Sequence, residues 1–133
     1  MKASVNWVPS QAGLAFEGKT ETGHTLKLDG NGEGLSPMES VLLSVGACSS
    51  VDVVEIMRKA RQTLESCEVE LSAQRAENPP RIFTEIHANF VVRGQDINEK
   101  HLKRAVELST EKYCSVMLML NKAVKITTSY EIR

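Results

Sequence analysis

The sequence has few cysteines and no short motif that joins two of them. Cys48, Cys67 and Cys114 lie far apart, none is part of a C-x-x-C pair, and no histidine lies within a few residues of any of them. The usual spacing of zinc ligands is therefore absent, and we expect no metal or other bound cofactor. Two interpretations of the thiols stay open. They either pack in the core as small apolar side chains or take part in dithiol chemistry.

An excess of charge of one sign is also missing. The 133 residues carry 16 Lys and Arg against 17 Asp and Glu, a net charge of -1 with no basic patch. Nucleic-acid binding therefore lacks its electrostatic footprint. The first residues contain no apolar signal-like run, and no segment is expected to approach the roughly 20 apolar residues of a membrane span. We predict a cytoplasmic protein, with no nucleic-acid or membrane partner, whose thiols stay reduced.

Two common groups of catalytic motif are absent as well. The hydrolase elbow G-x-S-x-G does not occur, and the glycines of residues 29–37 are not followed by the Lys-Ser or Lys-Thr of a phosphate-binding loop. The three histidines, His24, His87 and His101, are scattered along the chain. Each is predicted to be a surface residue, so neither a serine hydrolase nor a nucleotide site is supported.

The composition present is that of one ordinary domain, with 41% hydrophobic and 25% charged residues. This predicts a single domain over residues 1–133 with one core. Alternating apolar residues predict strands near residues 3–7, 14–16, 26–28, 67–71, 86–92 and 124–130, with early turns at residues 9–13 and 18–23. The first three strands should form an antiparallel meander. The whole pattern predicts an α+β fold with a largely antiparallel sheet.

A long helix is predicted to follow Ser36 as its N-cap, with Pro37 at the first helical position and Glu39 completing a capping box with Ser36. Residues 41–57 are apolar almost all round, which is typical of a buried central helix. Cys48 and Asp52 lie on its more polar side. A second helix is expected after Gly94 with Asp96 as its cap, and residues 110–120 either continue it or form a third.

The three cysteines differ in their predicted surroundings. Cys48 lies about three turns inside its helix, beyond the reach of the helix dipole, and Asp52 one turn on should raise the pKa of its thiol. A thiolate at Cys48 would therefore need a cation from elsewhere. Cys114 lies where a polar helical turn meets apolar residues. Cys67 alternates with Val69 in a strand and is the weakest functional candidate.

Three segments together resemble the OsmC/Ohr family of cysteine-based hydroperoxide reductases. They are SPMESVLLSVGACSSVDVV at residues 36–54, AVELSTEKYCSVMLML at residues 105–120 and KITTSYEI at residues 125–132. The family's two cysteines correspond to Cys48 and Cys114, and the order of elements agrees along essentially the whole chain. The resemblance implies an intertwined homodimer, with central helices enclosed by both subunits' sheets and two sites at the interface.

The resemblance also implies a chemistry. The Cys48 thiolate would attack a peroxide, become a sulfenic acid and condense with Cys114 to a disulfide, which an external dithiol then reduces. The best-characterised members hold an activating Arg near the thiolate with the first Glu of N-P-E-E-L. Here Met38 takes that Glu position, with Glu39 beside it as a supporting candidate, and residues 1–57 contain no Arg. The chain is therefore similar to a divergent branch of the family, because a lysine does not reproduce the guanidinium fork.

Two functions stay open on this basis. The first is a thiol peroxidase for organic hydroperoxides, with Cys48 as nucleophile and Cys114 as resolving thiol. The second is a non-catalytic module that binds a small hydrophobic ligand, or senses redox state, in an interface pocket around Cys48. A cation close to the Cys48 sulfur would favour the first, since an opposite charge within about 4–6 Å stabilises a thiolate.

Overall fold

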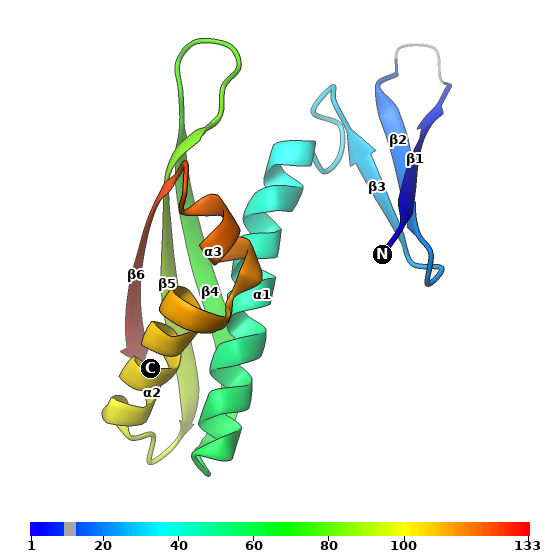
Figure 1. Cartoon of the computed structure of the whole chain (residues 1–133). Coiled ribbons are helices and arrows are strands. Elements are labelled where there is room, and N and C mark those ends of the chain that lie inside the picture. The colour runs from blue at the N-terminus through cyan, green and yellow to red at the C-terminus, as the bar shows by residue number, and fades with distance from the viewer. Residues whose placement is uncertain (10–12) are drawn as a thin grey trace. The chain divides into compact units, whose positions relative to one another are not determined.

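The computed structural model describes residues 1–9 and 13–133 (Figure 1). Three strands are followed by a long helix, two strands, a helical segment and a last strand, which confirms the predicted α+β fold. The chain divides into two compact units, residues 1–43 and residues 44–133. Each unit is described by itself, and the organisation as one domain over residues 1–133 stays a prediction.

The first unit contains a three-stranded antiparallel sheet in the order β1-β2-β3, as predicted. Its strands are β1 (Ala3–Val8), β2 (Ala15–Thr20) and β3 (Thr25–Asp29). The predicted turn at residues 9–13 falls partly outside the described residues. The second predicted turn is shorter than expected, because Gly18 lies within β2, paired with Val5 and Leu26. No described residue of this unit is buried.

Helix α1 (Pro37–Lys59) begins at the predicted residue. The Ser36 hydroxyl accepts a hydrogen bond from the Glu39 backbone N–H at 3.1 Å, and the Glu39 carboxylate accepts one from the Ser36 N–H at 3.0 Å. This is the reciprocal pairing of a capping box. Along the helix one side is buried, while Leu43 and Val51 are exposed. The buried residues of α1 are Val45, Gly46, Ser49, Val53 and Met57.

The second unit is built on a sheet in the order β4-β5-β6. Its strands are β4 (Thr63–Arg75), β5 (Phe83–Gln95) and β6 (Lys125–Ile132). The pairing of β4 with β5 is antiparallel, whereas β6 runs parallel to β5, because a helical crossover connects these last two strands. The predicted alternation in β5 is confirmed, since Ile86, Ala88 and Phe90 are buried. Figure 1 shows α2 and α3 on one face of this sheet.

The crossover consists of three short helical elements, α2 (Glu99–Leu108), the π-helix η1 (Ser109–Tyr113) and α3 (Ser115–Leu120). The prediction that Asp96 caps α2 is wrong. Asp96 lies in a turn with a φ of 50°, and the Asn98 side chain caps the helix by accepting from the Lys100 N–H at 3.0 Å. Of the two alternatives for residues 110–120, the third helix is the one observed, with the break at Cys114.

Helix α1 approaches β4 closely at Gly46 within the second unit. A Cβ atom added at Gly46 would lie 2.8 Å from the Leu71 Cδ1 atom. Such an approach is shorter than ordinary van der Waals contact, so glycine allows the helix to lie close to the strand. Cys48 lies two residues further along this helix, about half a turn from Gly46.

Helix α1 is, among the described residues, a candidate membrane span by length and composition. The expectation that no segment approaches a span is therefore wrong, because an 18-residue stretch of this 23-residue helix has a mean hydropathy of 1.6 with at most two charged residues. Core helices of water-soluble proteins often have the same length and composition. Here Val53 and Met57 are fully buried, and the Asp52 carboxylate accepts a hydrogen bond from Ser109, as expected of a helix packed within a protein.

Candidate functional site

The second unit brings two of the three cysteines together. Cys48 lies on α1 and is half-buried, while Cys114 precedes α3 and is fully buried. Their thiols are close enough to hydrogen-bond to each other. Cys67 lies elsewhere, on β4 opposite Val92, and burial raises the pKa of its thiol. The structure thus separates Cys67 from the pair that the sequence singles out.

The backbone around Cys114 explains how its side chain reaches Cys48. The π-helix η1 ends with a bond of 2.8 Å from the Cys114 N–H to the Ser109 carbonyl, and Cys114 then turns to an extended conformation. A single π turn of this kind often occurs at a functional site. Cys114 next caps α3, because its Sγ accepts from the Met117 N–H at 3.4 Å. The first turn of α3 therefore starts directly beside both thiols.

Three hydrogen-bond donors from this segment surround the Cys48 sulfur. Burial raises the pKa of Cys48, but the backbone N–H of Val116, the thiol of Cys114 and the hydroxyl of Ser115 outweigh it, so the pKa lies below its ordinary value. The Ser115 Oγ lies 3.8 Å from the Cys48 Sγ. The leading contributions at this sulfur include no Lys or Arg of the described residues. Hydrogen bonds thus stabilise the Cys48 thiolate, a role that the sequence predicts for a cation.

The neighbouring thiol of Cys114 is shifted in the opposite direction. Burial raises the pKa of Cys114 to about 11, and the adjacent Cys48 sulfur adds to this rise. Because the thiolate is the nucleophilic form, Cys48 is the more easily activated of the two thiols. The two sulfurs of this site therefore differ in how readily they ionise.

Asp52 lies one helical turn beyond Cys48 and acts against the thiolate, as predicted. Its carboxylate raises the pKa of both Cys48 and Cys114. The buried Ser109 hydroxyl donates to the Asp52 Oδ2 at 2.9 Å and also lies 3.2 Å from the Ser49 carbonyl. Asp52 therefore has a structural function, because it fastens the start of η1 to α1.

A surface cavity of about 430 Å³ lies beside this part of α1. Its lining is mixed rather than apolar, since Asp52, Lys59 and the exposed ring of Tyr113 form part of the wall. The Lys112 ammonium lies 5.4 Å from the centre of that ring. The cavity is lined by Asp52, Glu55, Ile56, Lys59, Leu108 and Tyr113.

Glu39, the supporting candidate, belongs to the first unit. The Ser36 N–H and hydroxyl donate to its carboxylate and lower the pKa of Glu39. These hydrogen bonds show that Glu39 caps the start of α1. Its support of Cys48 stays a prediction.

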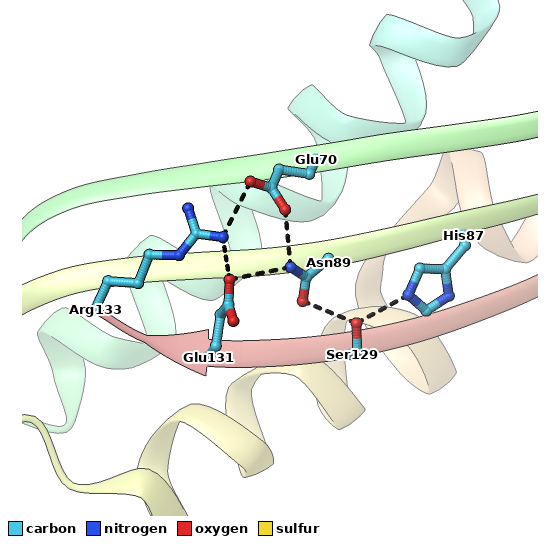
Figure 2. A network of polar contacts seen from close by, with 6 residues as sticks. All are labelled: Glu70, His87, Asn89, Ser129, Glu131 and Arg133. Carbon is cyan, nitrogen blue, oxygen red and sulfur yellow. Dashed lines mark hydrogen bonds and ion pairs between the residues drawn. The ribbon is translucent and has the colours of Figure 1, made fainter.

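A second polar cluster covers the face of the β4–β6 sheet shown in Figure 2. The two ring nitrogens of His87 lie 2.7 Å from the Thr127 hydroxyl and 2.8 Å from the Ser129 hydroxyl, and Ser129 donates to Asn89 at 2.8 Å. Asn89 in turn donates to Glu70, which pairs with Arg133. These cross-strand contacts are partly exposed and are typical of a solvated sheet face.

Neither this cluster nor the thiol pair is a metal site. Within residues 1–9 and 13–133, no group of three or more His, Cys, Asp or Glu side chains is arranged to hold a metal ion. Both ring nitrogens of His87 form hydrogen bonds with hydroxyl groups of β6. The thiol pair is therefore the strongest chemical feature of the described chain.

Comparison with known proteins adds a family and a fold. The family model described as OsmC-like protein matches residues 30–129. The chain is 50% identical to Protein YhfA of Escherichia coli (strain K12), over 99% of this chain and 98% of that protein. A hypothetical protein from Aquifex aeolicus VF5 has a similar crystal structure, with a TM-score of 0.86, 37% identity, and coverage of 100% of this chain and 97% of the other.

A more distant structure has a functional description. It is an organic hydroperoxide resistance protein from Legionella pneumophila, with a TM-score of 0.68 and 15% identity over 98% of this chain and 97% of that chain. At this identity the similarity establishes a shared fold.

Proposed function

Because the chain belongs to the OsmC-like protein family, we propose that it is a thiol peroxidase that reduces organic hydroperoxides. Cys48 is the nucleophile and Cys114 is the resolving thiol. The observation that carries the proposal is the hydrogen-bonded thiol pair, in which the pKa of Cys48 is lowered and that of Cys114 is raised. The description of the Legionella structure as an organic hydroperoxide resistance protein supports the substrate class.

The reaction follows from the order in which the two thiols ionise. The Cys48 thiolate attacks the terminal oxygen of the hydroperoxide, so that an S–O bond forms and the O–O bond breaks. The sulfur is oxidised to a sulfenic acid, and the alkoxide takes a proton from water and leaves as the alcohol. Cys114 then attacks the Cys48 sulfur. An S–S bond forms, and hydroxide leaves with the Cys114 proton as water.

An external dithiol closes the cycle by thiol–disulfide exchange, in which it is oxidised to its own disulfide and both cysteines return to thiols. The proposal includes no metal or bound cofactor. It places the protein in the cytoplasm, where reducing dithiols are available.

We further propose that the protein acts as a homodimer without nucleic-acid or membrane partners. A three-stranded sheet needs a packed apolar face to be stable, yet no described residue of the first unit is buried. Val5, Trp7 and Leu26 are among its exposed apolar side chains. A second copy that covers these residues would supply the missing burial, and light scattering after size-exclusion chromatography should give twice the chain mass.

The test of the peroxidase is consumption of an organic hydroperoxide by the reduced protein, with a dithiol reductant supplied. We expect turnover by the wild type and none by Cys48→Ser. Cys67→Ser is the matched control, because Cys67 lies outside the thiol pair, and it should keep the wild-type rate. Equal consumption by the wild type and Cys48→Ser would overturn the proposal.

The ligand-binding alternative is distinguished by the same assay. It predicts no turnover with any peroxide and dithiol, together with saturable binding of a small hydrophobic molecule.

A further inference from the structure

Ser115 directly follows the resolving cysteine and is placed by the break between η1 and α3. It is the first residue of α3 and is exposed, while Cys48 is half-buried. The Ser115 Oγ lies 3.8 Å from the Cys48 Sγ, within hydrogen-bonding distance for a sulfur atom. The hydroxyl therefore faces the sulfur that reacts first in the proposed function.

We propose that Ser115 is a positioning residue for Cys48, whose hydroxyl donates a hydrogen bond to the thiolate and takes the place of a cation. The proposal rests on the peroxidase function proposed above and extends it to the way in which the nucleophile is formed. A hydroxyl is a suitable donor because it rotates to direct its proton at the acceptor. A hydrogen bond to a charged acceptor is also stronger than one between neutral groups.

The other groups that face the Cys48 sulfur show why a donor matters. The Asp52 carboxylate on α1 acts against the thiolate, and Cys114 on the crossover is itself a thiol with a pKa of about 11, so that it donates rather than competes for the negative charge. The Val116 N–H is the remaining donor from α3. The backbone amide is fixed by the fold, so Ser115 and Cys114 are the two side chains on which the thiolate depends.

A comparison of two serines gives a matched test. Ser50 is also close to Cys48 in the sequence, but its hydroxyl donates to the Gly46 carbonyl at 2.6 Å. Replacement of Ser50 by alanine therefore removes a hydroxyl from α1, the helix that contains Cys48, without removing a donor to the thiolate. Ser115→Thr keeps the hydroxyl of Ser115, whereas Ser115→Ala and Ser115→Gly remove it.

The experiment is the pH profile of alkylation of Cys48 by iodoacetamide in the reduced full-length protein, read at the Cys48 peptide by mass spectrometry. In Ser115→Ala we expect the profile to move to higher pH and the rate at neutral pH to fall about threefold or more. Ser115→Thr should restore the wild-type profile, and Ser50→Ala should leave it unchanged. Thermal unfolding confirms that each variant is folded, and Ser115→Gly replaces Ser115→Ala if the latter is not.

An unchanged profile in Ser115→Ala would overturn the proposal, as would equal shifts in Ser115→Ala and Ser115→Thr. The readout requires no peroxide and no turnover. If the wild type has no peroxidase activity but Ser115→Ala still shifts the profile, the proposed function fails and the assignment of Ser115 stands. If turnover is present but the profile of Ser115→Ala does not move, the proposed function stands and the assignment of Ser115 fails.

Discussion

The thiols of Cys48 and Cys114 hydrogen-bond to each other, yet their pKa values move in opposite directions. Burial acts on both sulfurs, but Cys48 also receives donors from the start of α3, whereas burial dominates at Cys114. One thiol therefore ionises more readily than its neighbour. This asymmetry between two adjacent sulfurs carries the functional proposal.

The first prediction concerns the order in which the cysteines react. With limiting iodoacetamide at neutral pH, the reduced protein should be labelled first at Cys48, because its pKa is lowered. Cys67 should react more slowly, since burial raises its pKa, and Cys114 should react only toward pH values near its pKa of about 11. Peptide mapping over time measures this order. Faster labelling of Cys114 than of Cys48 would exchange the two roles.

Asp52→Asn should make Cys48 more reactive. The substitution removes a negative charge that raises the pKa of both thiols, while the new amide oxygen still accepts from the Ser109 hydroxyl. We expect faster alkylation of Cys48 at neutral pH and a change in the free energy of unfolding below about 1 kcal/mol. Asp52→Ala should unfold more easily because Ser109 loses that acceptor. Slower alkylation in Asp52→Asn would show that the carboxylate helps the thiolate.

Gly46 should tolerate one methyl group but not a branched side chain. In Gly46→Ala the new Cβ meets the mobile end of Leu71, and the gain in helix propensity of about 1 kcal/mol offsets the displacement. Gly46→Val should lower the free energy of unfolding by about 1 to 3 kcal/mol through overpacking. Chemical denaturation measures both effects. Adding Leu71→Ala to Gly46→Val should restore part of the loss, and no recovery would mean that the clash lies elsewhere.

The capping box at the start of α1 should give a stability that depends on pH. The pKa of Glu39 is lowered from 4.5 in the folded protein by the Ser36 donors. A lowered carboxyl pKa contributes stability above the unfolded pKa, which is lost as the pH falls through the folded value. Thermal unfolding of wild type and Glu39→Gln should therefore differ at neutral pH and converge in acid.

The same Glu39→Gln variant tests whether Glu39 supports Cys48. Glutamine also completes a capping box, so the variant keeps the cap and removes the charge. A residue that acts only as a cap would leave peroxide turnover at the wild-type rate. A fall in turnover without a matching loss of folded protein would instead confirm the predicted supporting role.

The sequence was informative where structure depends on neighbouring residues. The capping box of Ser36 and Glu39 and the alternation of Ile86, Ala88 and Phe90 are short-range patterns, and both were predicted correctly. The sequence does not distinguish Asp96 from Asn98 as the cap of α2, because both are good capping residues and only the backbone turn at Asp96 separates them.

The environment of the reactive thiol was harder to predict. The pairing of Cys48 with Cys114 was expected only through the family resemblance, because nothing in their spacing brings them together. The donors from Ser115 and Val116 depend on the π-helix and on the extended backbone of Cys114. The sequence does not predict these donors, since a serine after a cysteine has no distinctive signal in a single sequence.

The most direct test of the central claim is the product formed when the fully reduced protein meets one equivalent of an organic hydroperoxide. We predict that the wild type loses two hydrogen atoms through a disulfide that peptide mapping assigns to Cys48 and Cys114, while Cys114→Ser gains one oxygen atom at Cys48 as a sulfenic acid. If both thiols stay free after the peroxide is added, or if Cys48→Ser is oxidised at the same rate as the wild type, the account is contradicted.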